Sequence, residues 1–584
     1  MTDVLFINPT QQLLLTKEVN GTMLLATKLL QANIPTKILR FCQIEGYNED
    51  YENFIRNMTE KILQIDPKCV SFYTLWPNYH IMLRIAREVK NVRPDIVTVF
   101  GGPQASATAD EAMHALEYID YVCTGEGENT VVPFFRAVLG LGGDLSEVKG
   151  LYYRVNGQVV HNDLNVPLVD LNTLPHWDER LYENDYSVAE TLKKTSDPTM
   201  PIDVGRGCPY NCTFCSTSYF FCRTYRLKSP DAILNDIHYY KEKYGIQKFV
   251  FSHDAFTVNN TLVEAVCDRL IENNVNITWE CATRINCITE ELVLKMIKAG
   301  MTAIEMGIET GSERMQKISK KNLDLSKVKP MVDFCLKQGL KVSLFFMHAF
   351  PEETEQDLNE TLELVFSVLD MGVHYANMSY CAFNPKTELT AKYFDRLVYD
   401  PRIKILSRDV WGYQEEVEVI KSNKAIFSSF YHLDTPMRYE FQYLGALVFL
   451  YRRMPNTMRY LRQYYNGDYL RLYRDFYNRN LSIFDQEMDD IVEAVKKQPM
   501  QIVENILQGL DIPNRDALRA VCEYECDWRA ILDSREDTFV RKTYGFAYAD
   551  LKNKKTLESF APAQTTMLMQ KIGGKMGIRI LGQR

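Results

Sequence analysis

The sequence predicts an α/β protein with three parts: a doubly wound, Rossmann-like N-terminal sheet, a partial (β/α)6 barrel and a mostly helical C-terminal domain. Short apolar strands alternate with amphipathic helices from residue 4 to about residue 140, and the same alternation resumes at about residue 201. Beyond about residue 400 the strand patterns fade and helical patterns remain. We therefore expect domains at 1–145, 200–395 and 396–584, with a hairpin and linker at 146–199.

The N-terminal alternation predicts a parallel sheet with helices on both faces. Its expected strands are Val4–Asn8, Thr36–Phe41, Cys69–Leu75, Ile96–Gly101 and Tyr121–Thr124, and its expected helices are Lys17–Gln31, Tyr51–Gln64, His80–Val92, Ala109–Leu116 and Asn129–Leu139. Ligands of such sheets bind beyond the carboxyl ends of the strands. Glycine at these ends lets a large ligand approach the backbone, although glycine and proline also simply terminate strands. No Gly-x-Gly-x-x-Gly follows the first strand, so we do not expect an NAD-type site.

A hairpin and then a second strand–helix series follow. Asn156-Gly157 lies between two apolar segments, Leu151–Val155 and Gln158–His161, and predicts a two-residue turn before a proline-dotted linker. The expected barrel strands are Pro201–Gly205, Lys248–Ser252, Ile277–Cys281, Thr302–Gly307, Lys341–Phe346 and Tyr375–Tyr380, and the expected helices are Pro230–Lys243, Thr261–Asn273, Thr289–Ala299, Leu325–Gln338 and Thr354–Asp370. Helices of the C-terminal domain are expected at Arg438–Arg452, Asn456–Tyr465, Gln486–Lys497 and Arg515–Asp533.

Composition excludes several classes of protein. The chain has 584 residues, of which 46% are hydrophobic and 24% charged, which excludes long disorder, collagen and coiled coil. The formal net charge of −9 argues against a general binder of nucleic acid. We see no signal peptide and no apolar run near the roughly 20 residues of a membrane span, so we expect a cytoplasmic protein. Its 14 cysteines are then expected to be reduced thiols or metal ligands.

Three cysteines directly follow the first barrel strand. Cys208, Cys212 and Cys215 are spaced Cys-x3-Cys-x2-Cys in a loop, so their thiolates can converge on one soft metal or iron–sulfur cluster. Three ligands leave one iron of a cubane open to a substrate or cofactor. Zinc is the rival, but a structural zinc site takes four ligands. Cys222 is available as a fourth, although we expect a buried thiol there.

This spacing, with the aromatic Phe214 before the third cysteine, resembles that of the radical S-adenosylmethionine (SAM) enzymes. The resemblance continues at later strand ends, in Phe251–Phe256, Cys281–Arg284, Gly307–Gly311 and Phe350–Thr354. The segments Gly101–Ser106 and Asp120–Glu128 are similar to the cobalamin-binding domain of the cobalamin-dependent (class B methyltransferase-like) branch of these enzymes. The resemblance covers about residues 1–390.

The resemblance implies roles for the matched residues. Cys208, Cys212 and Cys215 are expected to hold a 4Fe–4S cluster. Expected SAM contacts are Phe214, Asp254, Arg284 and Glu309, for which a core ring, a loop cap, a surface salt bridge and a barrel-rim carboxylate are the alternative roles. Expected cobalamin contacts are Thr10, Gln11, Thr74, Trp76, Gly101, Gly102, Pro103, Gln104, Gly125 and Glu126. The residue that initiates the substrate chemistry is unknown.

Three departures from the usual pattern have consequences. The first loop, Asn8–Leu13, lacks the Asp-x-His-x-x-Gly motif, so cobalamin is expected to bind base-off without a histidine ligand from this loop. Gln104 stands where relatives often carry histidine, which keeps a polar contact but removes a titrating one. Ala349, preceded by His348, replaces the usual glycine before Phe-Pro.

The resemblance also implies a reaction. Reductive cleavage of SAM gives a 5′-deoxyadenosyl radical, which abstracts a substrate hydrogen before methylcobalamin donates a methyl group. The favoured function is methylation of an unactivated carbon of a small molecule or peptide in reducing, anaerobic cytoplasm, with flavodoxin or ferredoxin as the electron donor. The alternatives are a cobalamin-dependent oxidation, ring contraction or cyclisation without methyl transfer, and a cobalamin sensor with a structural cluster.

Substrate choice is expected to lie in the C-terminal domain, which matches no motif. Tyr460, Tyr464, Tyr465, Tyr469 and Tyr473 alternate there with Arg459, Arg462, Arg471 and Arg474. This pattern suits an aromatic or anionic substrate, and equally an amphipathic helix pair with half-buried tyrosines and solvated arginines. Cys522 and Cys526 share one helix face and are expected to be buried thiols.

Overall fold

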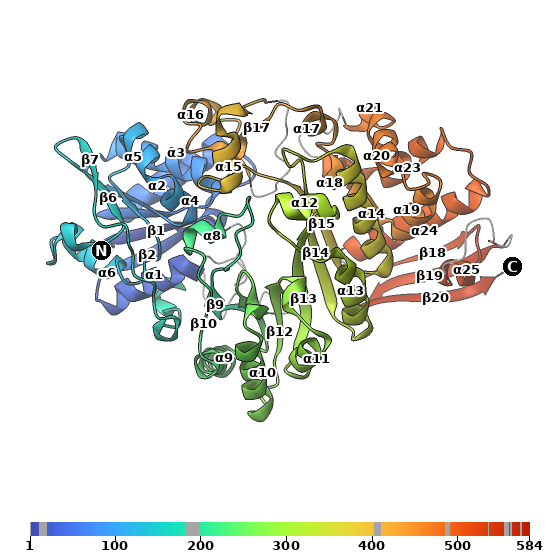
Figure 1. The fold of residues 1–584 in the computed structure, drawn as a ribbon, viewed down its shortest axis with the longest axis horizontal. Coiled ribbons are helices and arrows are strands. Elements are labelled where there is room, and N and C mark those ends of the chain that lie inside the picture. Colours follow the sequence, from blue (N-terminus) through green and yellow to red (C-terminus); the bar gives the residue numbers. More distant parts are fainter. Residues whose placement is uncertain are drawn as a thin grey trace.

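The computed structural model describes residues 2–10, 20–182, 198–401, 410–484, 491–534, 537–553, 560, 563–572 and 575–583. It confirms the predicted α/β fold class (Figure 1). No helix among these residues is long and apolar enough to cross a membrane.

The N-terminal region is a seven-stranded sheet of order β2-β1-β3-β4-β5-β6-β7. Its strands are β1 (Val4–Asn8), β2 (Thr36–Arg40), β3 (Cys69–Tyr73), β4 (Val97–Gly101), β5 (Tyr121–Cys123), β6 (Leu151–Val155) and β7 (Gln158–His161). Strands β1 to β5 are parallel. Its helices are α1 (Asn20–Gln31), α2 (Tyr51–Ile65), α3 (Tyr79–Val92), α4 (Pro103–Ala107), α5 (Ala109–Ala115) and α6 (Val131–Val138).

Side-chain alternation in β1 shows why this sheet has helices on both faces. Val4 and Phe6 join one apolar core, which includes residues of α1 and α6. Leu5 and Ile7 join the opposite core, with residues of α2 and α3. Because successive side chains of a strand point to opposite faces, a wholly apolar strand requires cover on both.

The predicted hairpin is present and extends this sheet. Strands β6 and β7 pair antiparallel with each other, and β6 pairs with β5. Asn156 and Gly157 have φ of 52° and 80°, the positive values that a type I′ hairpin turn requires. The hairpin therefore continues the first sheet, and the segment that follows it connects to the barrel.

The second region is a six-stranded parallel sheet of order β15-β14-β13-β12-β11-β8, the predicted partial barrel. Its strands are β8 (Thr199–Asp203), β11 (Lys248–Ser252), β12 (Thr278–Thr283), β13 (Met301–Glu309), β14 (Lys341–His348) and β15 (Tyr375–Tyr380). Its helices are α8 (Thr217–Phe220), α9 (Pro230–Tyr244), α10 (Asn260–Glu272), α11 (Glu290–Lys298), α12 (Glu313–Ile318), α13 (Val328–Lys337) and α14 (Glu355–Met371). Strand β8 ends earlier than predicted because Gly205–Arg206 (β9) leaves the sheet and pairs antiparallel with Arg226–Leu227 (β10).

The C-terminal region is mostly helical, as predicted. Its helices are α15 (Glu388–Tyr393), α16 (Val417–Ser422), α17 (Pro436–Glu440), α18 (Leu444–Arg453), α19 (Pro455–Gln463), α20 (Tyr469–Asn478), α21 (Leu481–Phe484), α22 (Ile491–Lys497), α23 (Pro499–Leu507), α24 (Arg515–Asp533) and α25 (Tyr548–Lys552). The short strands β16 (Leu397–Val398) and β17 (His432–Leu433) pair with each other. The sequence missed an antiparallel sheet of β18 (Thr538–Tyr544), β19 (Thr565–Ile572) and β20 (Lys575–Gln583).

One predicted helix, Arg438–Arg452, is wrong as a single element. The structure has α17 and α18 instead, separated at Phe441–Tyr443. The backbone N–H of Tyr443 donates to the hydroxyl of Tyr473 at 3.3 Å rather than continuing a helical ladder. The break places α18 along β15 (Figure 1).

The described parts of the segment from Phe383 to Leu433, residues 383–401 and 410–433, pack back onto the N-terminal region. Figure 1 shows α16 and β17 close to α3, far in sequence from it. The His80 ring bonds to the carbonyl of Trp411 at 2.6 Å, and the Gln104 amide donates to the carbonyl of Ile426 at 2.8 Å. The three parts of the chain therefore meet around the carboxyl ends of both parallel sheets.

Candidate functional site

The three motif cysteines lie in the loop between β9 and α8. Backbone bonds from Thr213 N to Ser319 O and from Leu389 N to Thr213 O, both 2.9 Å, tie this loop to the ends of α12 and α15. Burial raises the pKa of the Cys208 thiol, and the neighbouring Cys215 and Cys212 thiols raise it further. Burial also raises the pKa of Cys215. The three sulfurs are thus neighbours in a partly buried loop.

This arrangement suits a cluster better than a single ion. Among the described residues, no group of three or more His, Cys, Asp or Glu side chains is arranged to hold one metal ion. In a 4Fe–4S cluster each thiolate binds its own iron, so the ligands do not converge on a single point. The donor set of three free thiols in one loop fits such a cluster.

Cys222 differs from the prediction. It is exposed rather than buried, because residues 222 and 223 both adopt positive φ where the chain turns after α8. It lines a cavity of about 380 Å³ together with Cys212 and Cys215, to which Lys386 also contributes.

Arg284 lies directly against the cysteine loop. Its guanidinium stacks on the ring of Tyr210, with the carbon 3.8 Å from the ring centroid, and donates to the sulfur of Cys212 at 3.4 Å. A second nitrogen donates to the backbone carbonyl of Lys321. Arg284 is buried, so its positive charge acts at short range on the cysteine sulfurs. The surface salt bridge offered as its alternative role is therefore wrong.

Glu309 is connected to Arg284 through Lys321. The Lys321 ammonium forms a 2.8 Å ion pair with the Glu309 carboxylate at the end of β13. A Cβ at Gly307 would lie 2.4 Å from that carboxylate and 3.0 Å from the ammonium, so a side chain there would displace the ion pair. Lys321 was not predicted as a site residue, because no motif marks it. Tyr210 was not predicted as one either, although it lies inside the cysteine motif.

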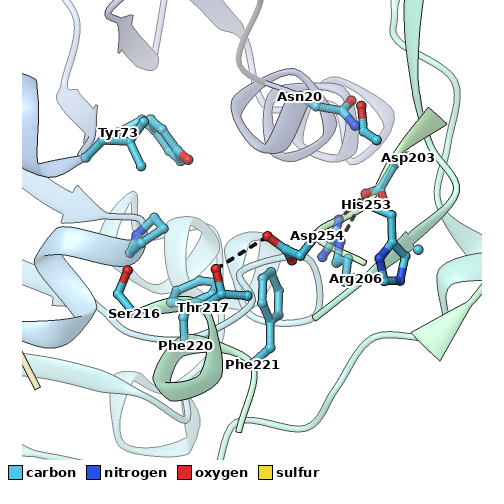
Figure 2. Close-up of a pocket in the computed structure, with 14 residues that line it drawn as sticks. Asn20, Tyr73, Asp203, Arg206, Ser216, Thr217, Phe220, Phe221, His253 and Asp254 are labelled. Carbon is cyan, nitrogen blue, oxygen red and sulfur yellow. Dashed lines mark hydrogen bonds and ion pairs between the residues drawn. The ribbon is translucent and has the colours of Figure 1, made fainter. Parts of the chain in front are cut away.

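Asp254 lies apart from this group, in a cavity of about 400 Å³ between the N-terminal sheet and the barrel (Figure 2). Its carboxylate accepts from the backbone N–H of Gly207 at 3.3 Å and from the Thr217 hydroxyl at 3.4 Å. Burial raises the pKa of Asp254. Tyr73 and Pro103 line the opposite wall, at the carboxyl ends of β3 and β4.

Phe214 lies near Phe350, with ring centroids 5.9 Å apart in an edge-to-face arrangement. It therefore packs between the cysteine loop and the end of β14. The structure thus brings Arg284 and Glu309 together through Lys321, and places Phe214 and Asp254 on other sides of the loop.

The predicted cobalamin contacts gather at the strand ends of the first sheet, with Gln11 outside the described residues. Gly102 has a φ of 97°, and a Cβ there would lie 2.9 Å from the Thr74 carbonyl, so this turn requires glycine. The Thr74 hydroxyl donates to the Gly101 carbonyl and accepts from the Ala105 N–H, both at 2.9 Å. Pro103 begins α4, and Thr10 is buried.

The other contacts have protein partners that the sequence did not indicate. The Gln104 side-chain amide donates to the Ile426 carbonyl, and the Trp76 ring packs edge-on against Phe430 with ring centroids 5.9 Å apart. Gly125 donates its N–H to the Ser106 hydroxyl at 3.1 Å.

Glu126 joins a buried ionic network between the two sheets, which we call the interdomain network and define as Asp203, Arg206, Arg226, Glu126 and Glu128. Arg206 lies 2.6 Å from Glu128, 2.9 Å from Asp203 and 3.4 Å from Glu126. Arg226 pairs with Glu126 as well. The network joins the segment after β5, which carries Glu126 and Glu128, to Asp203 and Arg206, which precede the cysteine loop.

The tyrosine and arginine pattern of the C-terminal domain is a packing feature. Tyr460, Tyr465, Tyr469 and Tyr473 are buried. Arg462 pairs with Asp370 at 2.5 Å, and Arg474 pairs with Glu355 at 2.8 Å. Cys522 is buried and Cys526 half-buried on α24.

Comparison with known proteins identifies two domains. The model of the radical SAM superfamily matches residues 202–365, and that of the B12 binding domain matches residues 25–134. The chain thus combines a B12-binding domain with a radical SAM domain, and this combination is that of the cobalamin-dependent radical SAM enzymes.

Several named proteins are similar to this chain. An uncharacterized methyltransferase of Pyrococcus horikoshii is 26% identical over 59% of this chain and 73% of its own length. The anaerobic magnesium-protoporphyrin IX monomethyl ester cyclase of Rubrivivax gelatinosus is 26% identical over 52% of this chain and 55% of its own. The hopanoid C-3 methylase of Methylococcus capsulatus is 27% identical over 51% and 55%. The match thus spans about half of the cyclase and of the methylase.

Two solved structures share the fold. The methyltransferase TsrM from Kitasatospora setae, with tryptophan and a SAM analogue bound, has a TM-score of 0.56 at 13% identity and covers 68% of this chain and 76% of its own. OxsB with aqua-cobalamin and SAM bound has a TM-score of 0.57 at 14% identity and covers 92% of this chain and 82% of its own.

Proposed function

We propose that this protein methylates an unactivated carbon of a small-molecule or peptide substrate, using a 4Fe–4S cluster, SAM and base-off cobalamin. The observation that carries the proposal is the cavity between the two sheets. One wall comes from the strand ends of the B12-binding domain, and the other from the cysteine loop and α8 (Figure 2). The loop that would generate a radical therefore faces the domain that would hold the methyl donor.

The chain's own residues have clear tasks in this proposal. The bound cluster, SAM and cobalamin supply the electron, the radical and the methyl group. Cys208, Cys212 and Cys215 would hold the cluster, while the Arg284 guanidinium stabilises the Cys212 thiolate across 3.4 Å. Lys321 fixes the Glu309 carboxylate at the end of β13, where it would accept hydrogen bonds from bound SAM. The Gly102 turn packs against the Thr74 backbone and would hold the loop after β4 in the shape that faces cobalamin.

The test is anaerobic reconstitution with iron, sulfide and cobalamin, followed by reduction with flavodoxin or ferredoxin and analysis of SAM products. Methylation predicts both 5′-deoxyadenosine and S-adenosylhomocysteine, and a product heavier by one CH2. Cys208→Ala, Cys212→Ala or Cys215→Ala should each abolish SAM cleavage and lower the iron content. Cys222→Ala is the matched control, because this thiol lines the same cavity but lies outside the motif. Retained cleavage in the motif variants would refute the proposal.

A second function is favoured by the names of two relatives, the magnesium-protoporphyrin IX monomethyl ester cyclases of Rubrivivax gelatinosus and Cereibacter sphaeroides. It keeps the cluster and cobalamin but transfers no methyl group. The same assay separates the two functions, since 5′-deoxyadenosine without S-adenosylhomocysteine indicates the second. Absence of any SAM cleavage would instead indicate a cobalamin sensor with a structural cluster.

A further inference from the structure

A third cavity, of about 560 Å³, lies along the outer strand β15 and is lined by all three parts of the chain. Trp76 contributes from the B12-binding domain and His348 from the end of β14. Residues of α17 and α18, among them Arg438 and Arg452, close the far side. We call this the β15 cavity.

The β15 cavity gathers polar atoms that have no partner. The Nε and Nη1 atoms of Arg438, Oε1 of Gln442, Nδ1 of His348 and Nε of Arg452 are shielded from solvent and make no hydrogen bond within the described residues. Shielded polar atoms in folded proteins are almost always satisfied. The residues around the β15 cavity therefore hold hydrogen-bonding capacity that the described residues leave unused.

The charges of the lining residues indicate that an occupant of the β15 cavity is an anion. Its lining includes two arginines, and none of the described residues that line it is acidic. The Arg438 guanidinium stacks on Tyr380, 3.6 Å from the ring centroid, and Arg452 stacks on Tyr375 at 3.8 Å. Stacking fixes each planar fork but leaves its edge free to donate, which is the geometry that binds a carboxylate or phosphate.

The two arginines stack on opposite ends of β15. Tyr375 and Tyr380 begin and end this strand, and their side chains leave it toward opposite faces, so Arg438 and Arg452 hold different sides of the β15 cavity. The lining also includes the aromatic rings of Trp76 and Phe449 and the amide of Asn377. An occupant with an anionic group and a planar apolar body matches this lining.

We propose that the β15 cavity binds the substrate, and that this substrate is an organic oxyanion, a carboxylate or phosphate ester with a planar apolar body, whose charge is held by Arg438. This inference rests on the proposed function only in identifying the bound molecule as the substrate. The anion site itself depends on neither the cluster nor cobalamin. Arg438 acts as a binding residue, and His348 at the end of β14 and Gln442 between α17 and α18 add hydrogen-bonding groups beside it.

The test is calorimetric titration of the full-length chain with three probes of equal ring size: phenyl phosphate, benzoate and benzyl alcohol. At least one anion is expected to bind more tightly than the alcohol, and the tighter of the two identifies the headgroup. Arg438→Gln should weaken anion binding about tenfold or more, because it removes charge-assisted hydrogen bonds. It should leave benzyl alcohol binding unchanged. Arg471→Gln, which removes the same charge from an exposed position on α20, is the matched control.

Two outcomes would overturn the inference: no anion binding above that of benzyl alcohol, or equal anion binding by wild type and Arg438→Gln. Arg438→Lys keeps the charge without the planar fork and should bind with intermediate affinity, which preserves the test if the glutamine variant unfolds. The failures of the two proposals are distinguishable. If reconstituted protein cleaves no SAM, the proposed function fails while the calorimetric result stands; if cleavage occurs but no anion binds, only this inference fails.

Discussion

Replacing Arg206 by methionine should separate the two sheets that face each other across the cofactor region. The Arg206 side chain is 11% exposed, and its carboxylate partners Asp203, Glu126 and Glu128 are 11%, 4% and 4% exposed. Methionine keeps most of the side-chain volume but removes the charge that, among the described residues, alone contacts all three carboxylates directly. Arg226 remains, and within the same residues its ion-pair partner is Glu126.

The magnitude follows from the burial of the three acids. Breaking a buried ion pair by removing one partner costs about 3–5 kcal/mol, because an uncompensated charge is left behind. Burial raises the pKa of Asp203, and Arg206 opposes that rise, so the variant's Asp203 pKa should rise further. A carboxyl with a raised folded-state pKa destabilises the fold as pH rises through that pKa. The loss should therefore be largest at neutral pH and shrink as the pH falls.

The assay is urea unfolding followed by circular dichroism at several pH values, with Glu128→Gln and the double variant completing a mutant cycle. We expect the first unfolding transition of Arg206→Met to move to lower urea at pH 7. The double variant should recover part of the loss, because one unpaired carboxylate is then neutral. A loss below about 1 kcal/mol, the value typical of an exposed ion pair, would refute a buried interdomain network. So would a loss that grows as the pH is lowered.

Two further predictions concern Gly102 and His80, both in the N-terminal region. Gly102→Ala should lower the free energy of unfolding by more than about 1 kcal/mol in thermal unfolding, because a φ of 97° and a Thr74 carbonyl 2.9 Å from the new Cβ exclude a side chain. An unchanged unfolding midpoint would contradict the required turn. Gly21→Ala, whose Cβ meets nothing within 4 Å, is the control. Burial lowers the pKa of His80 to about 4 in the folded protein, against about 6.5 in the unfolded chain. The contribution of neutral His80 to folding stability is therefore complete above about pH 6.5 and is lost as the pH falls toward 4, because the unfolded chain takes up a proton there. His80→Gln should reduce the slope of unfolding free energy against pH in that interval by about 1.4 kcal/mol per unit; urea titrations with an unchanged slope would contradict it.

Much of the fold was predictable because local patterns agreed with the tertiary structure. Strand β15 was predicted to the residue, and β1 and β11 likewise, since β1 is an apolar run and β11 and β15 alternate between buried and less buried side chains. Strand β8 was displaced by two residues because its pairing ends where β9 leaves the sheet, a tertiary event with no local signal. The antiparallel sheet β18–β20 was missed although β19 alternates, because helical patterns dominate the sequence before it.

The candidate site was predictable only where a motif names its residues. The three cysteines follow from their spacing, and Arg284 and Glu309 from strand ends that match the family. Lys321, which connects them, lies beyond α12 and reaches the site through a turn that no pattern marks. Glu126 shows the reverse case: a residue inside a matched segment whose charge is taken up by Arg206 and Arg226. A matched position therefore predicts the location of a residue more securely than its role.

The β15 cavity explains why the motifs leave the substrate unnamed. Its charged residues, Arg438 and Arg452, lie on helices outside both matched domains, and its wall of β15 lies beyond residue 365, where the barrel match ends. The predicted cofactor contacts thus lie in or near the two matched domains, while the charge that would select a substrate comes from the chain's own C-terminal region. Because stacking on Tyr375 and Tyr380 holds both guanidinium groups before any ligand arrives, binding an oxyanion there requires little reorganisation of the protein.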